Sequence, residues 1–330
     1  MARIALIATV LNEGASIDGL LNTLATQTHP PDEIVIVDGG SHDDTVARLR
    51  AYADRLPLTI IEAPGCNISQ GRNRAFDAVT AEIVAITDAG VRLEADWLEK
   101  LTQPLRDDPH VGVAAGFFQA DPHNVFEAAM GATVLPLADE IEPESFLPSS
   151  RSVALRADLA RQVGGYPEWL DYCEDLIFDL RLKQLRVPFV FVPEAVAHFR
   201  PRGSLRAYFK QYYRYARGDG KADLWRKRHI IRYLTYLVVL PVGLLLGALV
   251  HPLLWGLLLI GGLIYVWQPY RRLPVVMRRL PQTTAADWLY AVVLVPVIRL
   301  VGDIAKMLGY PAGWRWRLAQ RPPDWRQITA

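Results

Sequence analysis

The 330-residue chain has few cysteines and almost no net charge. Its two cysteines, Cys66 and Cys173, stand far apart without a CxxC or metal-binding spacing, so we expect reduced thiols in a cytosolic compartment. The formal net charge of +1 argues against nucleic acid as a partner, because nucleic-acid-binding domains carry a basic stripe or a high isoelectric point. The N-terminus runs directly into an apolar strand pattern and is too short and poorly flanked for a signal peptide. We therefore expect the first domain to stay in the cytoplasm.

Charge is also nearly absent from one long stretch, and this divides the chain. From Ile230 to Trp267 almost every residue is uncharged, whereas the residues up to about 225 alternate short apolar runs with charged amphipathic segments. Such alternation is typical of a soluble α/β domain. We predict a cytoplasmic α/β domain over residues 1–225 and a membrane domain over residues 226–330.

Strand and helix patterns alternate through the first domain. This order predicts a Rossmann-like, mostly parallel sheet with helices on both faces. Ligands bind such sheets at the carboxyl ends of the strands, which selects the polar residues to consider. No G-x-G-x-x-G follows the first strand, which disfavours a dinucleotide-dependent dehydrogenase. The expected strands are Ile4–Ala8, Glu33–Val37, Leu58–Ile61 and Ile83–Thr87, and the expected helices are Ser16–Thr26, Asp44–Ala53 and Ser69–Val79.

Carboxylates and amides follow three of these strands. The first strand leads into Asn12 and Glu13, the second ends at Asp38, and the fourth ends at Asp88. Any one of them alone is consistent with a helix cap or a turn, but three at one edge favour a binding site. Asp38 could accept hydrogen bonds from a base or ribose. Asp88 could bind Mg²⁺ or Mn²⁺, which prefer carboxylate oxygens and bridge diphosphates.

Two further segments contain residues suited to catalysis or anion binding. Arg72 and Arg74 lie early in a predicted helix, where they could bind a phosphate or base, or could remain solvated. Glu174 and Asp175 form a carboxylate pair that could supply a general base. The same pair could instead favour the amino end of a helix predicted over Asp175–Leu185.

A Gln/Arg/Tyr cluster follows, fifteen residues before the apolar stretch begins. Gln211, Arg214 and Tyr215 could hold an anionic ligand with a planar base, such as a nucleoside diphosphate. Together with the carboxylate pair, the cluster indicates an enzyme that moves a group from a soluble nucleotide donor to a lipid-held acceptor.

Taken in order, these residues resemble glycosyltransferase family 2, whose members share the GT-A fold. The similarity runs over about residues 3–220 and rests on the ordered set of motifs, including Thr9-Val-Leu-Asn12-Glu13 and a variant of the QxxRW motif. The resemblance implies that the donor is bound by Thr9, Asn12, Glu13, Asp38, Arg72, Asn73, Asp88, Gln211, Arg214 and Tyr215, and that Arg151 and Ser152 lie on the acceptor side.

The resemblance also implies an inverting transfer of a hexose. Asp175 would be the general base that removes a proton from the acceptor hydroxyl as it attacks the anomeric carbon. Glu174 would orient the acceptor, and a bound metal with Arg214 would stabilise the leaving diphosphate.

The sequence departs from the family pattern at two positions. The metal-binding strand of the family usually reads Asp-x-Asp, but here Gly90 replaces the second carboxylate. His198 follows a predicted strand and could supply the missing ligand, although a histidine in this position is also a common structural residue. Tyr215 replaces the tryptophan of the family motif and keeps an aromatic face.

The second domain carries a predicted transmembrane hairpin at about residues 230–268. Ile230–Val250 is long enough to span a bilayer, and Pro252–Trp267 is at the short limit. Arginines and lysines flank the pair on both sides, which places both ends in the cytoplasm. Ala285–Leu308 is interrupted by four charged residues and Pro296, so we predict an interfacial or re-entrant helix there in place of a third span.

These patterns predict a glycosyltransferase anchored in the inner membrane, with its catalytic domain facing the cytoplasm. It would move a sugar from a nucleotide-sugar donor, a UDP-sugar by preference, to a polyprenyl-linked glycan in cell-surface polysaccharide synthesis. Bacterial glucosyltransferases that build exopolysaccharide repeat units have a similar arrangement. Two alternatives remain: a polyprenyl-phosphate glycosyltransferase similar to dolichol-phosphate-mannose synthases, and a non-catalytic nucleotide-sensing membrane protein.

Overall fold

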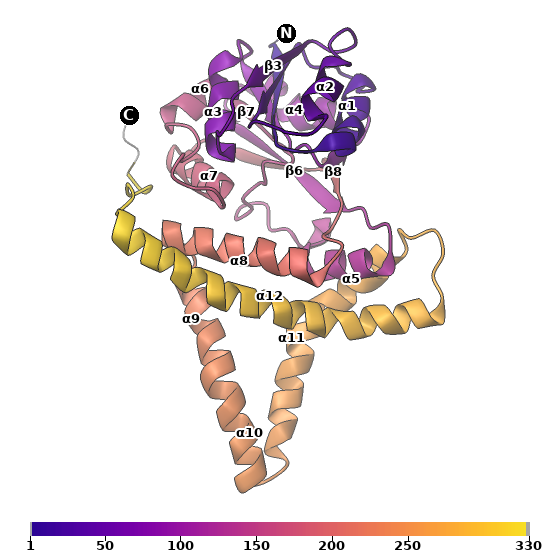
Figure 1. The fold of residues 1–330 in the computed structure, drawn as a ribbon, viewed down its shortest axis with the longest axis vertical. Helices are drawn as coiled ribbons and strands as arrows, with labels where there is room; N and C mark the ends of the chain where they lie inside the picture. Colours follow the sequence, from indigo (N-terminus) through magenta and orange to yellow (C-terminus); the bar gives the residue numbers. More distant parts are fainter. Residues whose placement is uncertain (1, 328–330) are drawn as a thin grey trace. The chain divides into compact units, whose positions relative to one another are not determined.

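The computed structural model describes residues 2–327, which form two compact units (Figure 1). The first unit holds the described residues up to Gln119, the segment Ala138–Phe199 and the residues from Pro323 onward. The second unit holds Ala120–Leu137 and Arg200–Pro322. It therefore includes two segments that precede the boundary expected at residue 225, because their helices pack against the C-terminal helices.

A sheet with the strand order β3-β2-β1-β4-β7-β6-β8-β5 forms the centre of the first unit. The neighbours β3, β2, β1 and β4 run parallel, as predicted, whereas β4 with β7, β6 with β7, and β5 with β8 are antiparallel. The fold is thus α/β. Its strands are β1 (Ile4–Val10), β2 (Glu33–Asp38), β3 (Leu58–Glu62), β4 (Ile83–Ile86), β5 (Val91–Leu93), β6 (Val113–Ala120), β7 (Val153–Arg156) and β8 (Phe189–Phe199).

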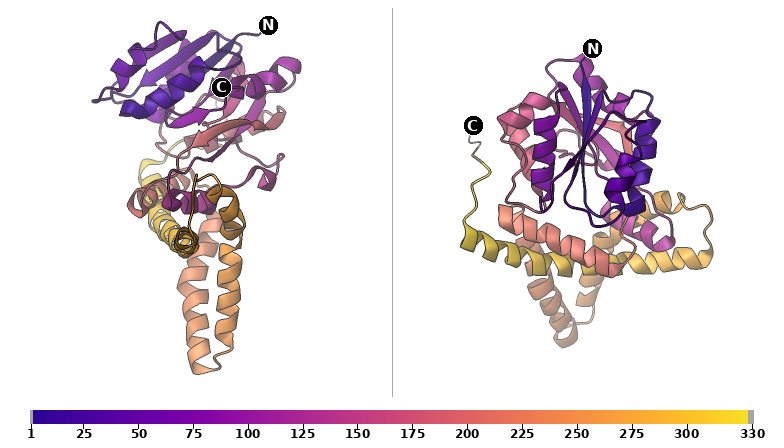
Figure 2. Two further views of the ribbon diagram at one scale, coloured as in Figure 1. Left: turned by 90° about the vertical axis from the view of Figure 1, so that its right-hand side faces the viewer. Right: turned by 45° about the horizontal axis from the view of Figure 1, so that its top comes forward.

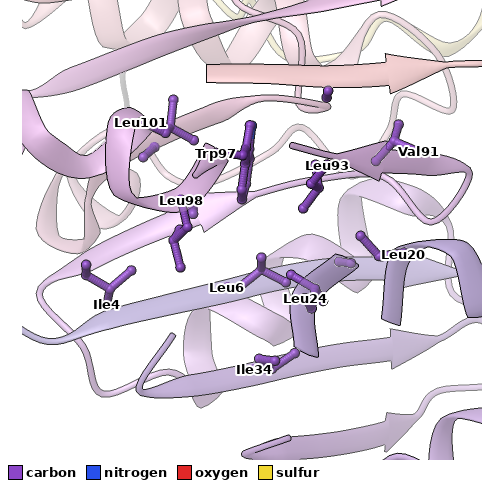
Figure 3. Close-up of a cluster of buried hydrophobic side chains, with 14 of the residues drawn as sticks. Ile4, Leu6, Leu20, Leu24, Ile34, Val91, Leu93, Trp97, Leu98 and Leu101 are labelled. Atoms are coloured by element: carbon purple, nitrogen blue, oxygen red, sulfur yellow. The ribbon is translucent and has the colours of Figure 1, made fainter. Parts of the chain in front are cut away.

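Helices cover both faces of this sheet, as the right-hand view in Figure 2 shows. Successive residues of β1 enter different cores: Leu6 packs with Leu24 and Trp97 on one face (Figure 3), and Ile7 packs with Phe76 on the other. This alternation follows from the two-residue period of a strand. The helices are η1 (Gly14–Ser16), α1 (Ile17–Ala25), α2 (Thr45–Arg50), α3 (Ile68–Ala78), α4 (Trp97–Asp107), η2 (Ala138–Glu140), α6 (Ala157–Gln162) and α7 (Glu174–Gln184).

The second unit is helical and is organised around two long helices that lie side by side. Tyr208 of α8 packs on Gly302 of α12, and one to two turns further along Tyr213 meets Gly309, so the two helices run in the same direction. A Cβ atom added at Gly309 would lie 2.2 Å from the Tyr213 carbonyl oxygen, so glycine is required there for the close approach. The helices are α5 (Val125–Val134), α8 (Leu205–Ala222), α9 (Arg226–Leu234), the π-helical turn η3 (Thr235–Val239), α10 (Leu240–Leu249), α11 (Leu254–Met277) and α12 (Ala285–Gln320).

The predicted hairpin is present as two helical arms. The continuous helix Arg226–Leu249 is the one helix within residues 2–327 that is long and apolar enough to cross a membrane, and 6% of its most apolar window is buried. The second arm, α11, packs back on α10 through Trp255 against Gly247 and does not meet the same criterion. Most large apolar side chains on both arms are exposed, which is unusual for a surface in contact with water.

The helix predicted over Ala285–Leu308 continues to Gln320 in the structure. Thr284 caps its beginning, and Pro296 and Pro311 lie within it. Its buried face consists largely of small and aliphatic residues that pack on α8 and α5. The additional length brings Trp314 and Trp316 into the helix, where the rings lie under the cationic ends of Arg226 and Lys221. An interfacial location of α12 stays a prediction.

Candidate active site

Asn12 joins the loops after β1 and β2, and the second of these loops is ordered by Asp38. This residue is 2% exposed; its Oδ2 accepts hydrogen bonds from the Gly40 and Ser41 amides (both 2.9 Å), and its Oδ1 accepts one from Ser41 Oγ (2.5 Å). The Asn12 amide donates to Ser41 Oγ (2.8 Å), and Asn12 Oδ1 accepts from the His42 amide (2.8 Å). Asp38 and Asn12 thus shape the rim predicted to hold the nucleotide, and most of the acceptor capacity of Asp38 is used within its own loop.

Thr45 joins the same two loops on the other side. Its Oγ1 accepts hydrogen bonds from the Glu13 and Gly14 amides (both 2.9 Å) and donates to Asp43 Oδ1 (2.5 Å). The bond from Thr45 lowers the pKa of Asp43. Thr9 lies at the end of β1, where it packs against Gly71: a Cβ added there would be 2.7 Å from Thr9 Cγ2. These contacts order the strand ends, as expected of turn and cap residues.

Arg72 is the centre of a buried charge cluster. Its Nη1 donates to Glu174 Oε1 (2.8 Å), its Nη2 donates to Asp88 Oδ1 (3.0 Å), and its guanidinium lies 4.9 Å from the centroid of the Tyr166 ring. Its side chain is 3% exposed, so it is not a solvated helix-face arginine, whereas Arg74 on the same helix is exposed. Burial alone would lower the pKa of Arg72, but Tyr166 and the carboxylates of Glu174 and Asp88 raise it by more, so Arg72 remains charged. A fixed guanidinium of this kind orients carboxylates with defined geometry.

The carboxylate pair opens helix α7. Glu174 and Asp175 occupy its first turn, where negative charge interacts favourably with the helix dipole. Burial raises the pKa of Glu174 to about 7, with the adjacent Asp175 as the next cause. Burial also raises the pKa of Asp175, against the opposing effects of Arg72 and Arg151. Carboxyl groups with raised pKa values can accept and release protons near neutral pH.

Cys173, the residue before the pair, has a backbone φ of +66°, which is uncommon for a residue with a side chain. Such backbone outliers are often found at functional sites. Asp179, one turn after Asp175 on α7, is 3% exposed, and its Oδ2 has no hydrogen-bond partner among residues 2–327. Burial raises the pKa of Asp179, and the charge of Asp175 adds to this effect. Sequence reasoning missed Asp179; its four-residue spacing from Asp175, which places both on one helix face, is the signal that could have found it.

The two residues predicted on the acceptor side lie in different environments. Arg151 Nε is 3.3 Å from Asp88 Oδ2, and its guanidinium stacks on Phe199 (4.5 Å to the ring centroid). Ser152 is 1% exposed, accepts a hydrogen bond from Trp97 Nε1 (2.8 Å) and donates one to a β8 carbonyl (3.0 Å). Arg151, unlike Ser152, is therefore positioned to contact a ligand.

Asn73, predicted as a donor contact, holds a neighbouring turn. Its Nδ2 donates to the Tyr166 carbonyl (2.9 Å), and its Oδ1 accepts from the Tyr166 amide (2.8 Å). Gly165 precedes Tyr166 and has a φ of +66°, and a Cβ added at Gly165 would lie 2.5 Å from Asn73 Oδ1. Asn73 thus fixes Tyr166, whose ring stacks on Phe178 of α7 (4.2 Å between centroids) beneath Arg72.

The residues of the first unit provide only part of a metal site. Asp88 is 28% exposed, and Arg72 and Arg151 already neutralise its charge. His198 is paired with Glu94 across β8 and β5, and no group of three or more histidine, cysteine or acidic side chains within residues 2–327 is arranged to hold a metal. Asp88 alone is an incomplete ligand set, so any bound ion would draw further ligands from substrate and water.

The Gln/Arg/Tyr cluster lies on α8 in the second unit. Gln211 Nε2 donates to Tyr215 Oη (2.7 Å), and Gln211 Oε1 accepts from Arg202 Nε (3.3 Å). The rings of Tyr215 and Tyr212 lie close together in a tilted arrangement (5.6 Å between centroids), and Arg214 is half-buried on the same helix. The motif is thus an ordered polar surface of α8.

The fold and the motif order have counterparts among known proteins. The glycosyl transferase family 2 profile matches residues 5–144, and the profile described as glycosyl transferase family group 2 matches residues 83–301, about two thirds of the chain. The chain belongs to glycosyltransferase family 2. The resemblance expected from the sequence is therefore confirmed. The chain is a glycosyltransferase, and its fold is that of the GT-A enzymes.

Relatives of this glycosyltransferase include two polysaccharide biosynthesis proteins. It is 26% identical to succinoglycan biosynthesis protein ExoA of Rhizobium meliloti over 275 residues, which are 76% of this chain and 78% of the relative. It is 24% identical to O-antigen chain rhamnosyltransferase RfbN of Salmonella typhimurium over 224 residues, 63% of this chain and 70% of the relative. A similar fold occurs in mannosyltransferase PcManGT from Pyrobaculum calidifontis, solved with GDP-Man and Mn²⁺ (TM-score 0.55, 19% identity, covering 97% of this chain and 88% of that one).

Proposed function

We propose that this glycosyltransferase transfers a hexose, with inversion, from a nucleotide-sugar donor to a polyprenyl-linked glycan during assembly of a cell-surface polysaccharide. A UDP-sugar is the expected donor. The observation that carries the proposal is the buried cluster in which Arg72 joins Asp88, at the end of a central strand, to the carboxylate pair that opens α7. The cluster supports the proposal because Asp88, the proposed donor-side carboxylate, and Glu174, the neighbour of the proposed base, share one guanidinium.

Asp175 is the proposed general base. Its carboxylate removes the proton from the acceptor hydroxyl while the hydroxyl oxygen attacks the anomeric carbon of the sugar. The bond between that carbon and the diphosphate oxygen breaks, and the nucleoside diphosphate leaves with the electron pair. Attack from the opposite face inverts the anomeric configuration. The raised pKa of Asp175 supports this role, because a base of pKa nearer to neutrality retains the proton more readily.

Glu174 is suited to orient the acceptor rather than to remove its proton. It is 6% exposed and bonded to Arg72, whereas the neighbouring Asp175 is partly exposed. This difference favours Asp175 as the group that meets the acceptor. Arg151, held by aromatic stacking, is the proposed cation beside the reacting groups.

A divalent cation remains part of the proposal for the donor side. Mg²⁺ or Mn²⁺, when bound, would offset charge on the donor diphosphate, and PcManGT was solved with Mn²⁺ and a nucleotide sugar. Asp88 is the carboxylate here that could contact the ion. Asp38 and Asn12 would form the rim beside the nucleotide. Gln211, Arg214 and Tyr215 are proposed to contact the diphosphate.

The proposed acceptor is lipid-linked and the proposed location is the inner membrane, with the first unit on the cytoplasmic side. Two features support this: the exposed apolar hairpin of the second unit, and the relatedness to ExoA and RfbN, whose names refer to succinoglycan and O-antigen synthesis. A membrane-anchored enzyme meets a lipid-held acceptor at the surface where that acceptor resides.

The test is nucleotide release from a panel of nucleotide sugars by the full chain in nanodiscs, with and without a lipid-linked glycan extract. Asp175→Asn should retain its fold and donor affinity while transfer falls by a factor of about 10² to 10⁴, the usual contribution of a positioned base. Asp171→Asn, on the loop before α7, is the matched control. Asp175→Asn turning over at the wild-type rate would refute the assignment of the base.

The acceptor arm of the same experiment decides between the candidate functions. Release that requires lipid-linked glycan supports the proposal. Release that proceeds equally with bare polyprenyl phosphate favours a polyprenyl-phosphate glycosyltransferase. Donor binding without turnover on any acceptor indicates a nucleotide-sensing protein. NMR of the product linkage tests inversion directly.

A further inference from the structure

A pocket of about 250 Å³ lies inside the second unit, between α5, α8, α11 and α12. Cationic and aromatic side chains contribute much of its lining. Arg272 comes from α11, Arg299 and Lys306 come from α12, and Tyr208 and Tyr212 come from α8. All of the lining residues belong to the second unit, on α5 and the residues just after it and on α8, α11 and α12. One of them, Tyr212, lies within the Gln211–Tyr215 motif, and the cationic residues of the lining lie outside the family motifs discussed above.

The positive charge in this pocket exceeds the negative charge. Asp303 is the carboxylate in the lining, and it already has several partners of its own: Arg232 Nε donates to its Oδ1 (2.8 Å), and the hydroxyls of Tyr236 and Tyr265 donate to its Oδ2 (3.0 and 2.6 Å). Lys306 Nζ is 3.8 Å from Asp303 Oδ1, at the outer limit of an ion pair. One carboxylate therefore faces four cationic side chains when Arg232 is included.

Arg299 is a cation of this pocket whose hydrogen bonding is incomplete. Its guanidinium lies 4.2 Å from the centroid of the Tyr265 ring and donates from Nη2 to the Tyr265 carbonyl (2.5 Å). Its Nε is buried and has no hydrogen-bond partner among residues 2–327. A buried donor without an acceptor is costly, and a cluster of cations in a partly dehydrated site is more so. A bound anion would relieve both costs.

Size and position restrict the class of anion. Pockets for drug-sized ligands usually measure about 300–1,000 Å³, so this smaller one suits a phosphate or diphosphate better than a whole nucleotide sugar. On α11 the exposed apolar side chains Ile264 (71% exposed) and Trp267 (62%) come just before Arg272. At 1.5 Å per residue, Trp267 and Arg272 are separated by about 7.5 Å along the helix. This spacing is comparable to the distance between the acyl region and the headgroup of a membrane lipid.

We propose that this pocket binds the phosphate or diphosphate group of a membrane lipid, with Arg272, Arg299 and Lys306 as its cationic ligands. The lipid-linked acceptor of the proposed function carries such a group, so the inference deepens that function and rests on it for the identity of the lipid. The pocket would hold the lipid phosphate and thereby present the attached glycan to the enzyme.

The experiment measures binding of the full chain, without donor, to phosphatidylcholine vesicles that contain a polyprenyl diphosphate. Vesicles with phosphatidylglycerol at the same charge density are the comparison, since they retain non-specific attraction. The wild type should prefer the diphosphate vesicles at least tenfold. Arg272→Gln and Lys306→Gln should each lose most of that preference, whereas Arg271→Gln, exposed at the adjacent position, should stay within twofold of wild type. Thermal midpoints confirm that the variants are folded.

Each outcome has a defined meaning. An equal loss in Arg271→Gln, or no loss in either pocket variant, overturns the proposal. A second arm adds inorganic pyrophosphate: competition at concentrations matching the lipid would assign the pocket to a free anion and reject the lipid. Lipid preference that depends on Arg272 without any glycosyl transfer would retain the pocket and refute the proposed function. Glycosyl transfer by an Arg272→Gln variant that binds the lipid as the wild type does would retain the proposed function and refute the pocket.

Discussion

Arg72 Nη1 donates a hydrogen bond of 2.8 Å to Glu174 Oε1, and both side chains are buried. The second terminal nitrogen of Arg72 reaches Asp88, so one guanidinium orders two parts of the proposed site that are distant in sequence. Burying these charges is costly by itself, and the geometry of the pair offsets that cost. The arrangement makes site assembly and folding of the first unit interdependent.

Arg72→Met should therefore destabilise the protein strongly. The substitution leaves Glu174 and Asp88 without their shared cation, and breaking a buried pair in this way costs about 3–5 kcal/mol. Arg74→Met, on the exposed face of the same helix, should change the free energy of unfolding by less than about 0.5 kcal/mol. Chemical denaturation of the purified full chain measures both. Similar effects for the two variants would show that the buried pair contributes little.

The raised pKa of Glu174 predicts a pH-dependent stability. Its pKa is about 7 in the folded chain and about 4.5 when unfolded, so the folded state binds more protons between these values. The contribution of Glu174 to stability is therefore greatest below pH 4.5 and is lost as the pH rises through about 7. Glu174→Gln should flatten the decline in thermal midpoint between pH 5 and pH 8. Parallel profiles for wild type and variant would contradict the assigned shift.

Local patterns were sufficient to predict the parallel half of the sheet. The runs over Ile4–Ala8 and Glu33–Val37 are apolar and β-branched, and the observed β1 and β2 differ from them by two residues or fewer at either end. The antiparallel half depends on pairing between remote segments, such as Arg92 with His198, and leaves little trace in a short window. Its short strand β5 is an example: three residues provide no periodic signal.

In the candidate site, too, some features could be predicted from the sequence and others could not. The polar residues at strand ends and the carboxylate pair could be identified from residue type and order, because strand ends converge at one sheet edge. The partners of those residues could not. Arg72 is bonded to a glutamate that only the folded chain brings near, and Asn73 is occupied by the Tyr166 turn. His198 is likewise bonded to Glu94, which lies just after β5 and is brought near by the pairing of β5 with β8; sequence alone does not reveal this contact.

Restoring the second carboxylate of the metal strand should strengthen metal binding. A Cβ added at Gly90 meets no atom within 4 Å, so Gly90→Asp can be accommodated without strain. The new carboxylate would lie two residues from Asp88 and supply the oxygen ligand type that Mg²⁺ and Mn²⁺ prefer. We expect the Mn²⁺ concentration for half-maximal transfer to fall about tenfold, an effect of about 1.4 kcal/mol. Gly90→Asn is the neutral control, and an equal response in both variants would exclude Asp88 and its neighbour as the metal site.

Membrane association should depend on the exposed apolar arms of the second unit. Leu237 (64% exposed) and Leu244 (51%) lie within the helix Arg226–Leu249, and an arginine near the centre of a spanning helix costs about 2.5–3.5 kcal/mol. The double variant Leu237→Arg/Leu244→Arg should shift most of the protein from the membrane to the soluble fraction in vesicle flotation. Leu11→Arg, which is also at an exposed leucine (53%) but in the first unit, should float as wild type does. If the double variant floated as well as the control, the exposed apolar arms would not be the membrane anchor.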